Sequence, residues 1–356
     1  MKRLLIAPLN WGLGHASRCV PVIEEFIERN IEIILAGDGL VYDFLHQRYP
    51  LLPIINLPGQ KITYQTRGSL NLALARSLAG FLRNIVSEHE WLQDSIEKYD
   101  IGAIISDNRY GLWSKSIPSF LITHQINIKS KGLWKFGEPL AHQKIHGFLN
   151  NFYEIWIPDV PQRPGLAGDL SHVEKSNSKY RYLGILSRFK YPAPIHDHPS
   201  NDILAILSGP EPQRTIFENI LLKTFENTTM RMNILRGLPS AHPTQLKSNG
   251  ITLISHLQDN EFVDLIVKSK NIICRSGYSS LMDLFRLQRT ALIVPTPGQS
   301  EQEYLARLHA NSGNFSSVAQ NKFKFYHFPA HTQISCSNIT SQDYLSKACE
   351  MVIKLL

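Results

Sequence analysis

Cysteine is scarce in this 356-residue sequence, and its spacing speaks against two common structural roles. The four cysteines are far apart in the chain: Cys19, Cys274, Cys336 and Cys349. A clustered metal site or a small disulfide-rich domain needs cysteines at short, regular spacings. We therefore expect a protein of a reducing, cytoplasmic setting.

Long apolar runs are also absent. No run approaches the ~20 residues that a membrane-spanning helix requires. Near the amino terminus, Lys2 and Arg3 precede an apolar stretch, but Asn10 and a glycine turn end it. This stretch is too short for a secretory signal, so it predicts the first strand of the fold.

The charge of the chain is moderate, and no nucleic-acid recognition motif occurs. The formal net charge is +7, from 37 Lys and Arg against 30 Asp and Glu. Because the basic residues are scattered, no nucleic-acid partner is expected. The excess is compatible with an anionic membrane surface, a phosphorylated ligand or simple solubility. With 43% hydrophobic and 19% charged residues, the composition is typical of a globular protein.

The most informative segment that is present is Asn10–Arg18, which contains Gly-Leu-Gly-His at Gly12–His15. It follows the apolar run Leu4–Ala7 and precedes an amphipathic segment, so it predicts a strand, a glycine-rich turn and a helix. The N-terminus of a helix attracts anions through its free N–H groups. His15 at such a turn can accept a proton or hold a phosphate, although the same turn also begins ordinary nucleotide-binding units.

A second turn of this kind lies far along the chain. The apolar run Asn271–Cys274 leads into Arg275–Ser280, and a helical pattern that contains Asp283 follows. Two strand–turn–helix sites in separate halves predict two nucleotide-binding domains with a ligand between them.

Strand-like and helical segments alternate on both sides of 161–200, a stretch rich in Pro, Gly, Ser and His that is typical of a linker. His196 and His198 in this stretch are expected to be solvated. The alternation predicts the α/β class, with parallel sheets covered by helices on both faces. We expect two doubly wound Rossmann-like domains that face each other across a cleft, with ligands at the carboxyl ends of the strands.

These segments resemble inverting glycosyltransferases of the GT-B fold, in particular the MurG-like enzymes of family 28. Gly12–His15 resembles the glycine-rich first loop of that family, whose histidine lies at the active site. Cys274–Gly277 is similar to the start of its donor-binding signature, in which an acidic residue grips the ribose; that residue falls on Asp283. Tyr182–Arg188 is similar to the segment whose arginine reaches the donor diphosphate.

Three further similarities concern single positions. Ser208-Gly209 with Gln213 is similar to a phosphate-binding loop, and Gln302-Glu303 matches two glutamines that hold the donor sugar. His124–Asn127 is similar to the acceptor-side segment His-Glu-Gln-Asn. The sequence departs from the family where the first loop lacks extra glycines, where the acceptor segment lacks its glutamate, and at Glu303. These departures leave the sugar open and do not indicate the acceptor of MurG.

The segment Gly12–Cys19 resembles a second group even more closely. Its Gly-x-Gly-His-x-x-Arg-Cys pattern is similar to UDP-sugar hydrolases of the pseudaminic acid pathway. Asp107–Trp113 also resembles an aspartate–tyrosine segment of those enzymes. In such a setting the histidine activates water.

The resemblance implies a set of site residues. The catalytic residues would be His15, His124 and Asp107. The donor nucleotide and diphosphate would contact Gly14, Arg188, Ser208, Gly209, Gln213, Arg275, Ser276, Gly277, Ser279 and Asp283. The donor sugar would contact Gln302 and Glu303, and the acceptor would contact Asn108, Arg109, Tyr110, Gln125 and Asn127. Because no Asp-x-Asp motif occurs, neither a metal ion nor a cofactor is expected.

Structural roles stay open for several of these residues. His124 is also compatible with a hydrogen-bonded structural histidine, Asp107 with a helix cap, and Arg109 with a surface salt bridge. Leu70–Val86 has an amphipathic pattern with interspersed arginines. It predicts either a core helix or a helix resting on an anionic bilayer.

We therefore expect a metal-independent inverting glycosyltransferase of cell envelope glycan synthesis, which uses a UDP-sugar and a carbohydrate or lipid-linked acceptor. A UDP-sugar hydrolase and a non-catalytic sugar-nucleotide-binding protein are the alternatives. The expected location is the cytoplasm, with peripheral contact at the inner face of the membrane as an option. The predicted domains are an acceptor-side domain at 1–188, a nucleotide-sugar domain at 189–337, and a helix at 338–356 that packs back on the first domain.

Overall fold

The computed structural model describes residues 2–58, 70–127, 138–173, 178–190, 192–193, 199–209, 211–238, 245–248, 250–324 and 343–356. The chain divides into two compact units. The first comprises Met1–Trp11, His15–Leu186 and Ile339–Leu356, and the second comprises Gly12–Gly14 and Ser187–Asn338. His196, His198 and residues 338–342 of the predicted last helix lie outside the described residues.

The first unit contains a parallel sheet with the strand order β3-β2-β1-β4-β5-β6-β7. Its strands are β1 (Arg3–Pro8), β2 (Ile33–Gly37), β3 (Ile54–Asn56), β4 (Ile101–Asp107), β5 (Ser119–Ile122), β6 (Glu154–Ile157) and β7 (Tyr180–Tyr182). The order of the strands reverses between β1 and β4, where Pro8 pairs with Asp107. Doubly wound sheets bind ligands at the carboxyl ends of strands beside such a reversal.

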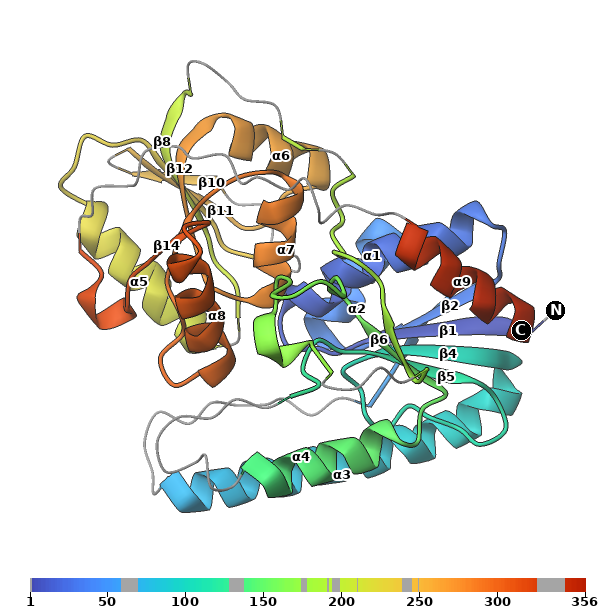
Figure 1. Cartoon of the computed structure of the whole chain (residues 1–356). Helices are drawn as coiled ribbons and strands as arrows, with labels where there is room; N and C mark the ends of the chain where they lie inside the picture. Colours follow the sequence, from blue (N-terminus) through green and yellow to red (C-terminus); the bar gives the residue numbers. More distant parts are fainter. Residues whose placement is uncertain are drawn as a thin grey trace. The chain divides into compact units, whose positions relative to one another are not determined.

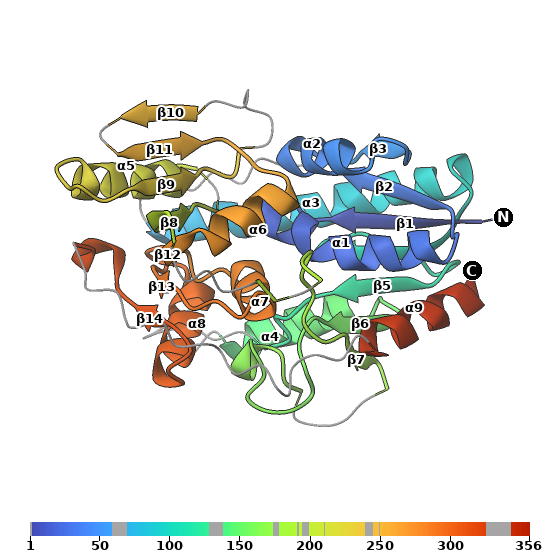
Figure 2. The same ribbon diagram turned by 90° about the horizontal axis from the view of Figure 1, so that it is seen from above.

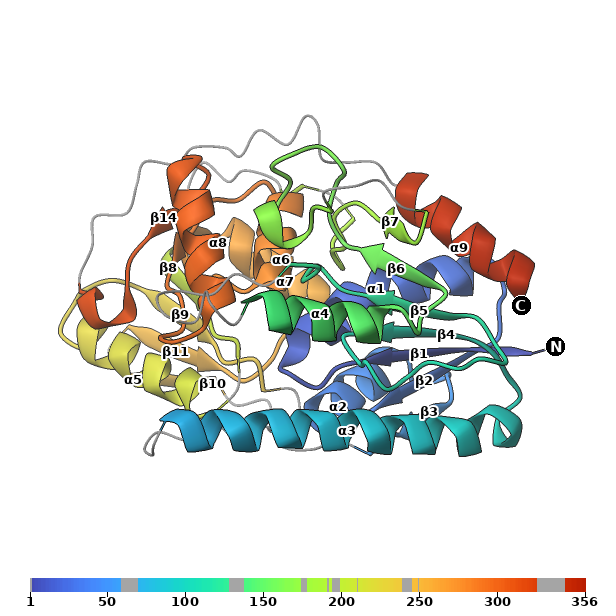
Figure 3. The ribbon, with the colours of Figure 1, turned by 60° about the horizontal axis from the view of Figure 1, so that its bottom comes forward.

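Helices cover both faces of this sheet. They are α1 (Leu13–Glu28), α2 (Gly39–Arg48), α3 (Leu70–Lys98), α4 (Glu138–Leu149) and α9 (Asp343–Leu355). Figure 1 shows α3 and α4 on one face and α1 and α9 on the other. The long α3 is seen along its length in Figure 3. Arg29, directly after α1, contacts α9, since its Nη2 donates to Ser346 Oγ over 2.7 Å.

The second unit contains a sheet with the order β10-β11-β9-β8-β12-β13-β14. Its strands are β8 (Asn201–Ile206), β9 (Met232–Leu235), β10 (Gln245–Ser248), β11 (Ile251–Ile254), β12 (Ser269–Cys274), β13 (Leu292–Ile293) and β14 (Ser316–Ser317). Among the described strands of this sheet, only β10 is antiparallel to its neighbour, β11. It lies at the edge of the sheet (Figure 2). Here the order reverses between β8 and β12. The helices are α5 (Gln213–Phe225), α6 (Asp259–Val267), α7 (Tyr278–Arg286) and α8 (Ser300–Asn311).

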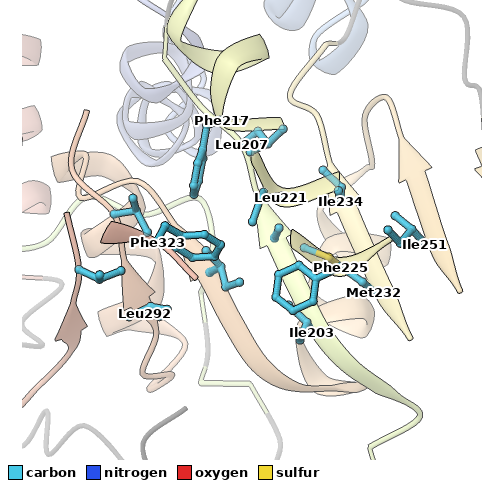
Figure 4. Close-up of a cluster of buried hydrophobic side chains, with 14 residues drawn as sticks. Ile203, Leu207, Phe217, Leu221, Phe225, Met232, Ile234, Ile251, Leu292 and Phe323 are labelled. Atoms are coloured by element: carbon cyan, nitrogen blue, oxygen red, sulfur yellow. The ribbon is translucent and has the colours of Figure 1, made fainter. Parts of the chain in front are cut away.

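The core of the second unit lies between α5 and the sheet. Phe217, Leu221 and Phe225 recur every fourth residue, so they share one face of α5. They are at most 1% exposed and pack with Ile203 of β8 and Ile234 of β9 (Figure 4). Each buried side chain of this kind contributes about 1.5–3 kcal/mol. This packing holds β8, and with it the turn that follows the strand.

The prediction of a linker at 161–200 is wrong for the first part of this stretch, which folds into the first unit up to Leu186. Asp159 follows β6 and is fully buried, and its carboxylate organises the loop after it. It accepts hydrogen bonds from the backbone N–H of Leu166 (2.8 Å) and Ala167 (2.9 Å) and from Ser171 Oγ (2.6 Å). Buried polar groups need such partners, and a sequence pattern does not reveal them.

No helix in the described part of the chain is long and apolar enough to cross a bilayer.

Candidate active site

His15 lies on the first turn of α1, directly after the glycine turn that follows β1. Gly12 has φ +81°, a backbone conformation that favours glycine, and it allows the chain to leave the strand and begin the helix. Arg18 is three residues further along α1 and therefore lies on the same face as His15. Both side chains point to the carboxyl end of β4.

Asp107 is the last residue of β4, and its side chain is fully buried. Its Oδ1 lies 2.9 Å from His15 Nδ1. The guanidinium of Arg18 contacts both carboxylate oxygens, with Nε on Oδ2 and Nη2 on Oδ1. Cys19 Sγ also donates to Oδ2 over 3.5 Å. Residues 92 positions apart in the sequence thus form one polar cluster at the strand reversal.

His124 joins this cluster from the neighbouring strand. It follows β5 and is 3% exposed, and Arg18 Nη1 donates to its Nδ1 over 3.3 Å. The structure therefore brings together the three predicted catalytic residues, and Arg18 contacts all of them. Sequence reasoning did not select Arg18. Its spacing of three residues from His15 on a predicted helix is the signal that identifies it.

The cluster favours a neutral His15 and an ionised Asp107. Burial lowers the pKa of His15 from its ordinary value, and the Arg18 guanidinium lowers it further, against the opposing effect of Asp107. Burial alone would raise the pKa of Asp107, but Arg18 and His15 hold it well below its usual range. A neutral imidazole hydrogen-bonded to a carboxylate has the form that a general base requires.

Arg109 is buried, so the alternative of a surface salt bridge is wrong. It is 1% exposed, and its guanidinium donates to Glu88 Oε1 over 2.9 Å, to the Pro8 carbonyl over 2.8 Å and to Asp38. Asn10 Nδ2 donates to the other oxygen of Asp38 over 2.9 Å. Arg109 therefore connects the loop after β4 with the end of β1, with α3 and with the residue that follows β2.

The other predicted acceptor residues differ in how firmly they are held. Asn127 Nδ2 donates to the Asp169 and His172 carbonyls, both over 2.8 Å, so Asn127 fastens one loop to another. Tyr110 is hydrogen-bonded to the side chain of Thr123. Gln125 is half-buried after β5. Asn108 has φ +54°, and among the described residues no donor reaches its buried Oδ1.

In the second unit, two glycine turns follow the strands on either side of the strand reversal. Ser208-Gly209 follows β8, and Gly277 precedes the first turn of α7 after β12. A Cβ atom placed on Gly209 or Gly277 would meet no described heavy atom within 4 Å, so there is open space in front of both backbones. Gln213 begins α5 beside this space, and no described donor reaches its buried Oε1. Ser279 lies in the first turn of α7, as Gly14 does in that of α1.

Arg275 is buried, and its guanidinium contacts groups within the second unit. Its Nη1 donates to the Val294 carbonyl over 3.2 Å and its Nη2 to the Gln213 carbonyl over 3.0 Å. The guanidinium also stacks over Phe217 at 4.1 Å. Arg275 therefore fastens the chain after β12 to the chain after β13 and to the start of α5.

Arg188 and Asp283 lie side by side, although the sequence predicts that they bind different parts of the donor. Arg188 Nη1 is 3.1 Å from Asp259, and its Nε is 3.9 Å from Asp283 Oδ2. Ser187 Oγ donates to Asp283 Oδ1 over 2.7 Å. Burial raises the pKa of Asp283 to about 6, in spite of Arg188. This part of the predicted site is built as an ion-pair cluster.

The predicted sugar-binding residues are anchored near the turn after β12. Ser276 Oγ donates to the Gln302 carbonyl over 2.8 Å, and Gln302 Oε1 accepts from the Thr296 backbone N–H over 2.8 Å. Glu303 Oε1 accepts from the Gly298 N–H over 3.3 Å. These bonds hold the start of α8 beside the open glycine turn. No group of three or more His, Cys, Asp or Glu side chains within the described ranges could hold a metal ion.

Comparison with known proteins identifies relatives of one kind. No protein-family model matches the chain. An uncharacterised glycosyltransferase of Methanosarcina acetivorans is 24% identical over 331 residues, which cover 87% of this chain and 84% of that protein. An uncharacterised glycosyltransferase of Methanosarcina mazei is 22% identical over 328 residues, which cover 87% of this chain and 85% of that protein.

Solved structures share the fold along the whole chain. A glycosyltransferase of kitacinnamycin has a TM-score of 0.61 at 11% identity, covering 99% of this chain and 94% of that one. MurG of Acinetobacter baumannii has a TM-score of 0.51 at 12% identity, with 100% and 92% covered. The spinosyn rhamnosyltransferase SpnG with thymidine diphosphate has a TM-score of 0.53 at 12% identity, with 99% and 92% covered. The predicted α/β fold of the GT-B type is confirmed.

Proposed function

We propose that the chain is a glycosyltransferase that moves a sugar from a UDP-sugar to a hydroxyl acceptor, with inversion at the anomeric carbon and without a metal ion. The observation that carries this proposal is the His15–Asp107 pair at the strand reversal of the first sheet. It occurs in a chain that has the fold of glycosyltransferases and whose relatives carry that name. We assign the acceptor to the predicted domain at 1–188 and the donor mainly to the predicted domain at 189–337.

The first unit supplies the base. With its Nδ1–H donated to Asp107, neutral His15 keeps a free electron pair on Nε2. That nitrogen takes the acceptor hydroxyl proton while the acceptor oxygen bonds to the anomeric carbon. The bond from that carbon to the diphosphate oxygen breaks, and the nucleoside diphosphate leaves with the electron pair. Asp107 then stabilises the imidazolium.

The second unit supplies the donor site. The open turns at Gly209 and Gly277 leave space for a diphosphate, and the N-terminus of α7 points N–H groups at it. These groups stabilise the departing charge without a metal ion. Asp283 accepts hydrogen bonds from the ribose hydroxyls, and Gln302 with Glu303 lies at the sugar. The assignment of uracil as the base of the donor comes from the resemblance to the MurG-like enzymes.

A UDP-sugar hydrolase is a second candidate, and one observation favours it. Arg18 and Cys19 distinguish the Gly-x-Gly-His-x-x-Arg-Cys pattern, and both contact the Asp107 carboxylate. In this case His15 takes a proton from water, and the water oxygen bonds to the anomeric carbon while the bond from that carbon to the diphosphate oxygen breaks. The free sugar and UDP are the products.

The acceptor is proposed to be a carbohydrate or a lipid-linked sugar. A lipid-linked acceptor would bring the protein to a membrane surface.

One surface of α3 is suited to such contact. Its exposed apolar side chains are Phe81 (40% exposed), Leu82 (37%) and Val86 (56%), and Arg83 is exposed beside them. Apolar side chains of this kind, with a basic neighbour, favour peripheral contact with an anionic membrane. Co-sedimentation with vesicles of anionic phospholipid tests this, and loss of binding in Val86→Ser is expected.

A ligand screen tests the function. Thermal unfolding is followed with UDP, GDP, dTDP, CMP and their sugars, and each nucleotide-sugar that stabilises the protein is then followed by NMR. A ligand present at 100 times its Kd stabilises by about 2.7 kcal/mol. A donor that stays intact until an acceptor is added, and then gives the inverted anomer, supports the transferase. Rapid release of the sugar by the protein alone supports the hydrolase, and no stabilisation by any ligand contradicts both.

A further inference from the structure

Arg18 is buried between two histidines and one carboxylate, and neither the fold nor a glycosyl-transfer reaction requires a cation there. Its side chain is 2% exposed. The Nε and Nη2 groups take both oxygens of Asp107, Nη2 also lies 2.9 Å from His15 Nδ1, and Nη1 lies 3.3 Å from His124 Nδ1. One guanidinium therefore faces the ring nitrogens of both histidines.

The chemistry of the guanidinium limits what these contacts can be. Arginine remains protonated and only donates hydrogen bonds. At His15 Nδ1, the Arg18 donor and the Asp107 acceptor compete at equal distances of 2.9 Å. If the Nδ1 atom carries the proton, it donates to Asp107 and Nε2 is free to act as a base. If Nδ1 accepts from Arg18, the proton resides on Nε2 and the base is blocked.

The charges of the cluster decide how readily His15 gains a second proton. Among the described residues of the first unit, the charged and titratable groups that face His15 are Arg18 on its own helix, Asp107 at the end of β4 and His124 after β5. Cys19 contacts the same carboxylate. Arg18 and Asp107 cancel each other while both histidines are neutral, so a proton on either ring would leave a buried net charge. In a simple His–Asp pair, by contrast, the carboxylate favours the imidazolium.

We propose that Arg18 is a positioning residue that offsets the charge of Asp107 and thereby keeps His15 unprotonated and available as a base. Arg18 does not touch substrate; it acts through Asp107 and His15. This inference rests on the proposed function for its catalytic consequence, but the protonation of His15 can be measured without any substrate.

The test is an NMR titration of the His15 imidazole in the full chain, compared between wild type and Arg18→Gln. Glutamine keeps a donor for Asp107 and removes the charge. We expect His15 in wild type to titrate below its ordinary value of 6.5. In Arg18→Gln its titration should move upward by about one pH unit or more, because Asp107 then faces it without compensation. The acidic limb of the kcat/KM profile should move in the same direction.

Two further variants keep the inference falsifiable. Arg18→Lys retains the charge, so His15 should still titrate below 6.5 even if Arg18→Gln does not fold. Arg29→Met removes an arginine that directly follows the far end of the same helix and contacts Glu25, Ser346 and Glu350. It should leave the titration of His15 unchanged.

The outcomes separate this inference from the proposed function. A folded Arg18→Gln protein with an unchanged His15 titration would overturn the role of Arg18, as would a titration above 6.5 in Arg18→Lys. If His15 shifts as expected but no donor is ever turned over, the inference stands and the proposed function fails.

Discussion

Arg109 and Glu88 form an ion pair in which both side chains are only 1% exposed, with 2.9 Å between Nη1 and Oε1. Glu88 lies on α3 and Arg109 follows β4, so the pair joins the helical layer to the edge of the sheet where the catalytic cluster lies. The Glu88 carboxylate also accepts from the Gly111 N–H over 3.3 Å. The pair supports the site without being part of it.

Arg109→Met should destabilise the protein, because it leaves Glu88 and Asp38 without their common cation. Removing one partner of a buried pair costs about 3–5 kcal/mol. Urea unfolding measures this loss. The matched control is Arg3→Met. Arg3 Nε lies 3.2 Å from Glu32 Oε2 and both side chains are exposed, so the loss in the free energy of unfolding should be at most ~1 kcal/mol. Equal losses in the two variants would contradict a supporting role for the buried pair.

His15→Ala should lower kcat by ~10² or more while the Kd for the donor nucleotide stays nearly unchanged, because a general base acts on the acceptor proton. Steady-state kinetics and calorimetric titration with UDP measure the two quantities. His46→Ala, an exposed position on α2, is the control. Weaker nucleotide binding with normal turnover would remove His15 from the role of base.

Nucleotide affinity should fall as the pH drops through about 6, because that is the pKa to which burial raises Asp283. The protonated carboxyl accepts ribose hydrogen bonds less well. Since phosphate also titrates near this pH, the comparison is between wild type and Asp283→Asn, in calorimetric titrations from pH 5 to 8. The variant should bind UDP weakly at every pH, and its residual dependence should be that of the nucleotide alone.

The same carboxyl has a predictable effect on stability. A raised pKa in the folded state means that the folded chain holds the proton more tightly than the unfolded chain. Asp283 therefore favours folding at low pH, and this contribution is lost as the pH rises through about 6. Asp283→Asn should unfold no more easily than wild type at pH 8. Asp264→Asn, exposed on α6, should alter neither affinity nor stability.

Treatment with EDTA should leave turnover unchanged, because the donor diphosphate is expected to be neutralised by backbone N–H groups at the start of α7. Turnover is measured before and after exhaustive dialysis against the chelator. A loss that Mg²⁺ restores would show that the reaction needs a metal ion.

The sequence alone determined the α/β class and the positions of the two glycine turns. Strand-length apolar runs that alternate with amphipathic segments leave few other folds. Glycine before a predicted helix marks a turn that other residues adopt poorly, and Gly12 bears this out with φ +81°. The motif Gly12–His15 is also local, so the sequence places His15 at the start of the helix after β1. Arg18 could have been identified in the same way, since a spacing of three residues puts it on the same helix face as His15.

Only the tertiary structure decided where the arginines point. Arg18, Arg109, Arg188 and Arg275 are equally compatible with a ligand contact and with a buried ion pair as long as only the sequence is known. Their partners come from elements distant in the sequence: Asp107 at the end of β4 for Arg18, Glu88 on α3 for Arg109, and the carbonyl of Val294, after β13, for Arg275. Whether a guanidinium faces a ligand or the protein interior depends on these long-range contacts, which no local pattern encodes.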